Sequence, residues 1–450
     1  MADFTSEQLI EVLRRFPPTG RYLLAISGGV DSMVLLHALV ALPHAQRKVS
    51  AIHINHGLSP DSQARAGLCQ RVCARLAVQI TVLAIDARPP PGESPEAWAR
   101  DLRYAALENV MRPGDMILTA HHRDDNCETL LLQLLRGAGP HGLAAMPECR
   151  SFDCGWLGRP LLCYSRDQLE IYASRHGLEW IDDASNRDLR YARNFLRQRV
   201  MPSLKQRWPG CASTLTRAAK RQAEAAMLLD RLAEGDLRGA VEQPNVLGVA
   251  PLKSLEGPRL RNALRFWIRR LQFSLPSEAK LDQIVQTVLG ARPDASPCVH
   301  WHEAEVRRYR NTVYLLAPSR ELGPPSVCTW TPDETLSIAG GTLYAVRALG
   351  RGIKASACEG GRLEVRLRRG GERCRPAGHA HHKPLKKLLQ EAGIPPWVRK
   401  RIPLIFLQGE LVAVSGLWVC HPFSAGADES GWDPIWESDQ RPLCKARHGP

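Results

Sequence analysis

The fold of this chain is decided by the stretch Tyr22-Leu23-Leu24-Ala25-Ile26-Ser27-Gly28-Gly29-Val30-Asp31-Ser32, in which an apolar run ends in Ser-Gly-Gly. The residues that follow, Met33-Val34-Leu35-Leu36, have helical character. Glycines let backbone amides approach an anion closely and tolerate positive φ, and the N-terminus of a helix attracts negative charge. Asp31 would repel a phosphate unless a cation lay between them. The stretch therefore predicts Mg²⁺ near Asp31 and a pyrophosphate site formed by Ser27, Gly28, Gly29, Val30 and Ser32.

A tight turn between a strand and a helix is the alternative for this stretch, and Gly-Gly alone would favour it. It is not a GxxxxGK(S/T) loop, because no lysine stands at the required place. The stretch resembles the PP-loop motif of enzymes that cleave ATP to AMP and pyrophosphate while they activate a carbonyl oxygen as an adenylate. Such enzymes include tRNA lysidine synthetases, tRNA thiolases, GMP synthetases and asparagine synthetases. The resemblance implies ATP and Mg²⁺ as cofactors and an adenine nucleotide alpha-hydrolase-like fold, but it does not name the acceptor.

A length of 450 residues leaves room for two or three domains. The content of 44% hydrophobic and 24% charged residues is ordinary for soluble proteins. No apolar run approaches the roughly 20 residues of a membrane span, and the first residues lack the pattern of a signal peptide. We therefore expect a cytoplasmic protein with no membrane partner. The 13 cysteines include no CxxC pair, which favours free thiols over a disulfide framework or a zinc site.

The net charge of +14 is concentrated in two stretches. Residues 187–207 carry seven Arg or Lys against one Asp, and residues 362–401 carry twelve against three Glu. A run of charge is usually a solvated face. Two separate basic zones in a chain that also has a phosphate loop favour RNA as the partner instead.

The organisation of the first part predicts an α/β fold, a parallel sheet with helices on both faces, because strand-like and helical runs alternate. The expected strands are Leu23–Ile26, Val49–Asn55, Gln79–Ile85 and Met116–Ala120, and the expected helices are Ser32–Leu42, Ser62–Leu76, Pro95–Met111 and Asp125–Leu135. We expect a catalytic domain over residues 1–215. A mainly helical middle domain over 216–320, a linker over 321–340 and a small basic α+β domain over 341–450 follow it.

Three polar clusters fall where the expected parallel strands end, so they should converge on one cleft. The first is the Ser27–Ser32 loop. The second holds His53, Asn55 and His56, which we expect to line the nucleotide, although a satisfied histidine at a strand end is an equal alternative for each. The third is His121-His122-Arg123-Asp124-Asp125-Asn126-Cys127-Glu128-Thr129, which opens an apolar helix.

Asp125 and Glu128 of the third cluster are three residues apart and share a helical face. Acids in the first helical turn also suit the helix dipole, so a capping role for Asp124 or Asp125 is the alternative. Beside an ATP loop, such acids can hold Mg²⁺ or receive an ammonium group. A His-x-x-Asp spacing is compatible with zinc, but no second pair of ligands supports it.

Further motifs make the resemblance specific. Leu135–Leu143 and Arg159–Leu162 follow the third cluster in the order found in the tRNA(Ile)-lysidine synthetases. Asp182-Asp183-Ala184-Ser185-Asn186 and Tyr191–Arg197 are similar to that family's D-x-S-N and R-N-x-x-R signature. The tail resembles its C-terminal domain in Arg369–Glu372, Leu385–Glu391 and Ile394–Trp397.

The resemblance implies a two-step reaction. ATP adenylates the C2 carbonyl oxygen of the wobble cytidine in the CAU anticodon of tRNA(Ile), and the ε-amino group of free L-lysine then displaces AMP to form lysidine. It also implies roles for catalytic residues: Asp31 for Mg²⁺, Asp125 and Glu128 for the lysine ammonium, and Arg193 and Arg197 for phosphate charge or the tRNA backbone.

Less specific expectations concern the substrates. Arg103 could face the lysine carboxylate or a phosphate, an exposed helical arginine being the alternative. His121 and Asn194 are expected near lysine or tRNA. A basic C-terminal set should hold the acceptor-stem end of the tRNA, and it comprises Lys386, Lys387, Arg399, Lys400 and Arg401. The sequence leaves the oligomeric state open, a homodimer included.

Rival functions need features that this chain lacks. A tRNA thiolase would need cysteines for an iron–sulfur cluster or a persulfide, typically with CxxC, and GMP or asparagine synthetases would carry a glutaminase domain or an N-terminal catalytic cysteine. A tRNA-binding protein with a degenerate loop is the non-catalytic alternative. The intact Asp31, Asp125 and Glu128 argue against it.

Overall fold

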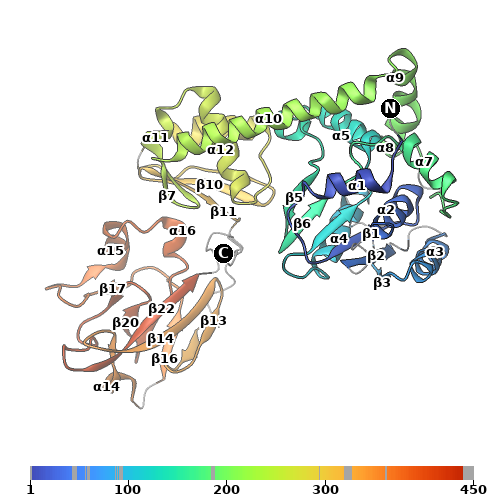
Figure 1. The fold of residues 1–450 in the computed structure, drawn as a ribbon. Coiled ribbons are helices and arrows are strands. Elements are labelled where there is room, and N and C mark those ends of the chain that lie inside the picture. Colours follow the sequence, from blue (N-terminus) through green and yellow to red (C-terminus); the bar gives the residue numbers. More distant parts are fainter. Residues whose placement is uncertain are drawn as a thin grey trace. The chain divides into compact units, whose positions relative to one another are not determined.

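The structure is a computed structural model that describes residues 3–438 except 43–47, 56, 58–60, 87, 89, 91–94, 184–187, 293, 319–326 and 360–361. It comprises two compact units, Met1–Leu228 and Leu229–Pro450 (Figure 1). The division lies within the long helix α10 (Cys211–Leu237).

The first unit is built on a six-stranded sheet in the order β3-β2-β1-β4-β6-β5. All neighbours pair in parallel except β5 and β6, which form an antiparallel hairpin at one edge. This confirms the predicted parallel sheet, and each predicted strand lies within a residue of an observed one. The strands are β1 (Tyr22–Ile26), β2 (Val49–Asn55), β3 (Gln79–Ala84), β4 (Met116–Thr119), β5 (Cys149–Phe152) and β6 (Gly155–Gly158).

Helices cover both faces of this sheet because both faces are apolar. Along β1, Leu24 and Ile26 join a core with helices α2 and α3, whereas Leu23 joins a second core with α4 on the other face. Such two-sided burial is what parallel strands require. The helical segments are α1 (Ser6–Leu13), α2 (Val30–Val40), α3 (Ser62–Arg75), α4 (Pro95–Glu108), α5 (Arg123–Leu135), α6 (Pro140–Leu143), α7 (Arg166–Arg175), α8 (Ala192–Phe195), a π-helical turn at Leu196–Val200, and α9 (Met201–Arg207).

The second unit begins with a helical region that also carries a five-stranded antiparallel sheet, β7-β8-β11-β10-β9. The region predicted to be mainly helical thus also contains five strands. Its elements are β7 (Val241–Gln243), β8 (Val246–Gly248), α11 (Val249–Lys253), α12 (Gly257–Arg270), α13 (Glu278–Gln283) with a π-helical turn at Ile284–Leu289, β9 (Cys298–Trp301), β10 (Ala304–Tyr309) and β11 (Thr312–Leu316).

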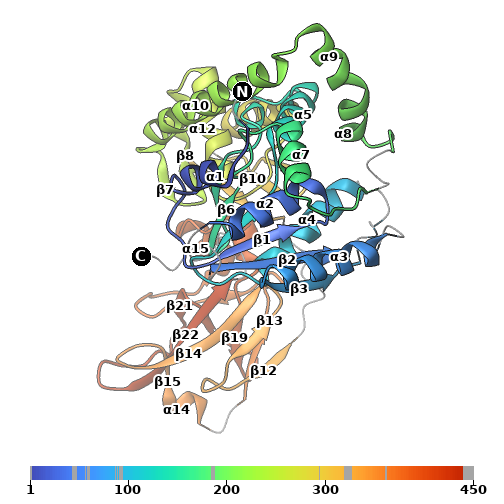
Figure 2. The same cartoon turned by 45° about the vertical axis from the view of Figure 1, so that its right-hand side comes forward.

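The last part of the second unit is rich in strands. It contains two larger sheets, β12-β16-β19-β20-β21 and β13-β14-β22-β15, and a separate two-stranded sheet, β17-β18. Figure 2 shows β14 alongside β22, which pair over nine residues each. The elements are β12 (Cys328–Trp330), β13 (Leu336–Ile338), β14 (Gly341–Leu349), β15 (Ile353–Lys354), α14 (Ala355–Cys358), β16 (Leu363–Arg366), β17 (Arg373–Cys374), β18 (Lys383–Pro384), α15 (Leu385–Glu391), α16 (Pro396–Arg399), β19 (Leu404–Leu407), β20 (Glu410–Val414), β21 (Trp418–Val419) and β22 (Ser430–Ser438).

The range 321–340, predicted to be a linker, includes β12 and β13, and each of these strands belongs to a sheet of the second unit. Residues 321–326 lie outside the described residues. Trp330 of β12 is buried in the core of this part of the chain.

Candidate active site

The loop between β1 and α2 has the geometry of an anion site. Gly28 adopts a φ of +85°, which side-chain-bearing residues rarely take. The Ser32 hydroxyl ties the loop together, because Oγ accepts from the Ser27 N–H at 3.2 Å and donates to the Gly29 carbonyl at 2.8 Å. Helix α2 starts at Val30 with no side-chain cap on its N-terminus. Its first N–H groups are therefore available to a ligand.

Asp31 lies in the first turn of α2, beside this loop. Its Oδ1 atom is buried and has no hydrogen-bond partner among the described residues. Burial raises the pKa of Asp31, and the charge of His122 opposes that rise. A buried carboxylate oxygen without a donor is costly unless something else binds it. The residue therefore fits a cation better than a cap.

His122 connects Asp31 to the acid cluster. Its Nε2 lies 3.3 Å from Asp125 Oδ2 and 3.7 Å from Asp31 Oδ2, and only 1% of the residue is exposed. The same side chain caps α5 as half of a capping box with Asp125. The capping role expected for an aspartate is thus shared with the histidine before it. The polar clusters after β1 and after β4 meet at one point.

Asp125 and Glu128 of α5 form ion pairs with both arginines of the Arg193-to-Arg197 motif. Arg193 Nε donates to Glu128 Oε2 at 2.9 Å, and Arg197 Nε donates to Glu128 Oε1 at 2.7 Å. Arg197 Nη2 reaches Asp125 Oδ1 at 2.8 Å. Burial would raise the pKa of Asp125, but the positive groups around it, His122 and Arg193 foremost, outweigh that and lower it. Asp125 is therefore ionised at neutral pH.

The two arginines are not fully enclosed by these acids. Their side chains are 23% and 27% exposed, whereas the side chain of Glu128 is 1% exposed. Both arginine side chains are thus partly open to solvent. Glu128 accepts from both arginines, which lie four residues apart in the chain.

The Asp182-Asp183 motif packs against the anion loop. The N–H of Ile181 donates to the Gly28 carbonyl at 3.0 Å, and Asp183 pairs with Arg65 of α3. The Cβ and Cγ of Arg65 lie beside Gly28. Residues 184–187, which hold the rest of the motif, lie outside the described residues.

The predicted nucleotide-lining residues take different positions. His53 is 4% exposed, and its Nδ1 lies 2.9 Å from the Ile26 carbonyl, where it supports the start of the loop. Asn55 accepts the N–H of Gly57 at 3.0 Å and closes a turn after β2. His56 lies outside the described residues. The structure thus shows His53 bonded to the end of β1, just before the Ser27–Ser32 loop, and Asn55 bonded within the turn after β2.

The residues predicted to lie near lysine or tRNA, His121, Arg103 and Asn194, have different surroundings. Burial lowers the pKa of His121 to about 3, and its Nδ1 lies 2.8 Å from Thr119 Oγ1. Desolvation and the nearby charges of Arg100 and Arg193 lower the pKa of Arg103, which places Arg103 of α4 within the electrostatic reach of the acid–arginine cluster. Asn194 donates to the Asp188 carbonyl at 2.9 Å.

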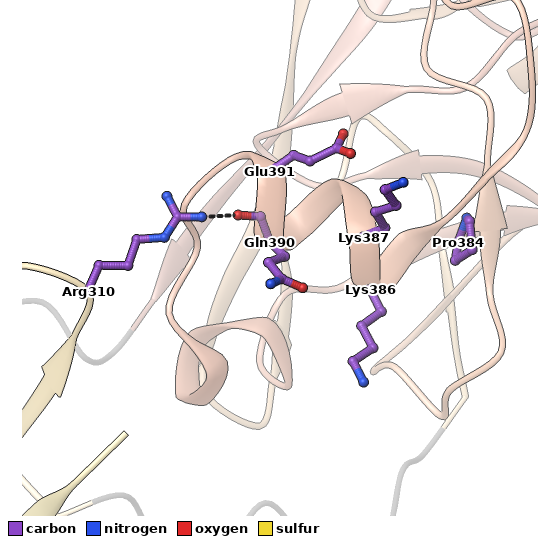
Figure 3. A pocket seen from close by; sticks show the side chains of 6 residues that line it. All are labelled: Arg310, Pro384, Lys386, Lys387, Gln390 and Glu391. Carbon is purple, nitrogen blue, oxygen red and sulfur yellow. Dashed lines mark hydrogen bonds between the residues drawn. The ribbon is translucent and has the colours of Figure 1, made fainter. Parts of the chain in front are cut away.

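The predicted basic set of the C-terminal part is split by the structure. Lys386 and Lys387 are exposed on α15 and line a pocket of about 510 Å³ with Arg310, Gln390 and two further residues. Figure 3 shows the two lysines extending in different directions from α15, while Arg310 Nη2 donates to the Gln390 carbonyl at 2.5 Å.

Two members of that set point inward instead. Arg399 donates from Nε to the Ile394 carbonyl at 2.7 Å and from Nη2 to the Tyr309 hydroxyl at 2.9 Å, and Arg401 is only 7% exposed. Lys400 is exposed. Consecutive residues of an irregular segment face different ways, and sequence alone could not separate them.

His122 and Lys205 are the site residues that sequence reasoning missed. Lys205 Nζ lies 2.7 Å from Asp124 Oδ1. His122 stands inside the cluster quoted from the sequence, and its place immediately before two aspartates at a helix start was a usable signal. Lys205 lies far along the chain, so only the tertiary fold brings it to Asp124.

The described residues contain no group of three His, Cys, Asp or Glu side chains that could hold a metal by themselves. None of the helices in the described part of the chain is long and apolar enough to cross a membrane.

Comparison with known proteins adds three matched regions. The PP-loop domain matches residues 3–204, the TilS substrate binding domain matches 247–314, and the TilS substrate C-terminal domain matches 363–436. A U34-tRNA thiolase from Methanococcus maripaludis aligns at 16% identity and a TM-score of 0.41, covering 49% of this chain and 78% of its own.

Relatives match over nearly the full length. The chain is 44% identical over 417 residues to a tRNA(Ile)-lysidine synthase of Methylococcus capsulatus, covering 92% of this chain and 95% of that one. It is 41% identical over 433 residues to a tRNA(Ile)-lysidine synthase of Coxiella burnetii, covering 96% of each.

Proposed function

The chain belongs to the tRNA(Ile)-lysidine synthase family and is an ATP-dependent ligase that modifies tRNA, and we propose the following reaction for it. ATP adenylates the C2 carbonyl oxygen of the wobble cytidine in the CAU anticodon of tRNA(Ile), and diphosphate leaves. The ε-amino group of L-lysine then attacks C2 and expels AMP. The lysidine so formed pairs with A rather than G, which switches codon recognition from AUG to AUA.

The observation that carries this proposal is the link from Asp31 through His122 to Asp125. It joins the nucleotide loop to an acid cluster within 3.7 Å. A two-step ligase needs both at one place, because the intermediate formed at the loop must be reached by the amine. The intermediate itself need not leave the cleft.

The Ser27–Ser32 loop is proposed to bind the phosphates of ATP. The left-handed Gly28 and the uncapped start of α2 support this, since both leave backbone N–H groups free for an anion. Mg²⁺ is proposed at Asp31, whose unpartnered Oδ1 fits it. Mg²⁺ usually takes one or two carboxylates and completes its shell with phosphate oxygens and water, so a cluster of three protein ligands is not required. When bound, the ion would neutralise charge on the departing diphosphate.

Asp125 and Glu128 are proposed to receive the lysine ammonium or to draw a proton from it, since only the neutral amine is a nucleophile. Asp125 is ionised at neutral pH and lies at the start of α5, next to the loop. Glu128 is already held by two guanidinium groups. We therefore assign Asp125 the direct contact with the ammonium and Glu128 the positioning of the arginines.

Arg193 and Arg197 are proposed to stabilise phosphate charge, either on the nucleotide or on the tRNA backbone. Glu128 fixes both guanidinium groups side by side, and each retains an exposed side. A pair of preorganised arginines loses little entropy when an anion arrives. Arg103 would add a third positive group from α4.

The tRNA is proposed to be held by both units. The middle and C-terminal domains, over 216–320 and 341–450, would bind it through phosphates, and Lys386, Lys387 and Lys400 are the exposed candidates. Arg399 and Arg401 support that surface from within.

The test is a labelling reaction with purified protein, ATP, Mg²⁺ and labelled lysine. It uses the two transcripts that share a CAU anticodon, the isoleucine and the methionine tRNA. We expect label in the isoleucine tRNA alone, with AMP and diphosphate formed in equal amounts. Label in neither tRNA would refute the reaction, and label in both would refute the proposed specificity.

A further inference from the structure

Two exposed aromatic side chains flank the short helix α8: Tyr191 is its N-cap residue and Phe195 is its last residue. Tyr191 is 36% exposed and Phe195 is 48% exposed. They lie one helical turn apart, since the Phe195 N–H donates to the Tyr191 carbonyl at 3.0 Å. Residues at this spacing share one face of a helix. We call the two side chains together the aromatic pair.

The opposite face of the same turn completes the active site. At about 100° per residue, Arg193 points away from the aromatic pair, and its Nε donates to the buried Glu128 at 2.9 Å. The next residue after the pair, Leu196, is 5% exposed and anchors the segment. Figure 2 shows α8 at the periphery of the first unit. The aromatic pair is thus held within two residues of a group that contacts the acid cluster, and it faces outward.

Charge indicates what covers the pair. Residues 187–207 carry seven Arg or Lys against one Asp. The described members Arg190 and Arg199 are exposed; the side chain of Arg190 is 89% exposed, and its Nη2 lies 2.7 Å from Oδ2 of Asp188. Exposed aromatics amid arginines are how proteins hold unpaired bases: the rings stack on a base while the cations contact its phosphates. An apolar protein partner would not require this charge.

We propose that Tyr191 and Phe195 form a stacking platform for an unpaired anticodon base that flanks the reactive cytidine. This inference rests on the proposed function and deepens it, because it names the side chains that hold the loop open. Stacking on one neighbour keeps that base out of the loop's own stack. The cytidine beside it is then presented to the Asp31–Asp125 cleft.

The test is a double-mutant cycle between protein and RNA. An anticodon stem-loop RNA with the CAU sequence is compared with the same RNA carrying an abasic residue at the anticodon adenine, each bound to wild-type protein and to Phe195→Ala. We expect each single change to weaken binding about tenfold and the double change to weaken it little further. If the losses of affinity from the abasic adenine and from Phe195→Ala multiply in the double change, the two groups do not interact and the proposal is overturned.

Companion variants separate stacking from other causes. Phe195→Tyr should bind like the wild type, whereas Phe195→Leu should behave like Phe195→Ala, because leucine keeps apolar area but lacks a π face. Neither change should alter the slope of affinity against salt, while Arg190→Ala should reduce it by about 0.7 if one phosphate contact is lost. Ile171→Ala, which truncates an exposed apolar side chain on α7, is the matched control and should change nothing.

Two further outcomes are distinguishable. If Phe195→Ala alters the oligomeric state in light scattering instead of RNA affinity, the pair is a protein interface and the proposal fails. If the wild type transfers lysine to tRNA but shows no coupling in the cycle, the platform is refuted and the proposed function stands. If coupling is present and no lysine is transferred, the proposed function is refuted and the platform stands.

Discussion

Arg197 holds the carboxylate of Glu128 at two points, from Nε to Oε1 at 2.7 Å and from Nη2 to Oε2 at 2.9 Å. Glu128 is 1% exposed, and its other neighbour is Arg193. The pair therefore stabilises the fold around the site as well as the site itself. A change at Glu128 can therefore be followed both in the free energy of unfolding and in lysine transfer.

Glu128→Gln should destabilise the first unit. Removing one charge of a buried pair leaves uncompensated guanidinium groups, and such losses are about 3–5 kcal/mol. We expect the free energy of unfolding in urea to fall by about 3 kcal/mol and lysine transfer to fall at least a hundredfold. The matched control is Glu179→Gln, whose partner Arg75 is as exposed as Glu179 itself, and it should cost less than about 1 kcal/mol. Equal losses in the two variants would contradict the assignment.

Asp31→Asn should separate activity from stability. Because burial raises the pKa of Asp31, its ionised form is disfavoured in the folded protein, and the penalty applies at pH values above that raised pKa. The amide removes it, so the melting temperature should stay the same or rise. Lysine transfer should be lost, and Mg²⁺ with ATP should no longer raise the melting temperature as it does in the wild type. A variant that still labels tRNA would rule out the cation role.

His121 should make stability depend on pH. Burial lowers its pKa from 6.5 to about 3, so between these values the unfolded chain binds a proton that the folded chain does not. Stability from this group is present above pH 6.5 and is lost as pH falls through that window. Between pH 7 and pH 5 the wild type should lose about 2 kcal/mol more than His121→Gln. If urea unfolding gives the same pH dependence of stability for the wild type and for His121→Gln, His121 is not the cause.

Gly28→Ala and Gly114→Ala should cost similar stability but differ in function. Both glycines have positive φ, +85° and +81°, and alanine there costs about 1 kcal/mol. A Cβ at Gly28 would also meet the Arg65 side chain at 3.4 Å, whereas nothing lies within 4 Å of one at Gly114. Only Gly28→Ala should weaken ATP binding, measured by calorimetry. ATP binding lost to the same degree in both would mean a general effect on folding.

Lys387→Ala should affect tRNA binding but not stability, whereas Arg399→Ala should affect stability. Lys387 is exposed. If it contacts one phosphate of a tRNA duplex, its loss should reduce the slope of log K against log salt concentration by about 0.9. The melting temperature should not change. Arg399 bonds the Tyr309 hydroxyl, so its loss should lower the melting temperature of the second unit by several degrees. A salt slope unchanged in Lys387→Ala would remove this lysine from the tRNA surface.

The sheet was predictable from the sequence because its strands are short apolar runs separated by helices of regular period. β1 and β2 carry their own signal, and the polar clusters after β1 and β4 follow from where parallel strands end. The hairpin β5–β6 and the strands β12 and β13 were not predicted. Such short segments are selected by their neighbours in the sheet rather than by local pattern.

The sequence by itself determined the parallel sheet, the nucleotide loop and the identity of the acidic and basic groups, because each depends on local spacing. Only the tertiary structure decided how those groups pair. It placed His122 between Asp31 and Asp125, turned Arg193 and Arg197 onto Glu128, and buried Arg401 while leaving Lys400 exposed. Pairing of charges depends on distances between segments far apart in the chain, and no periodicity encodes them.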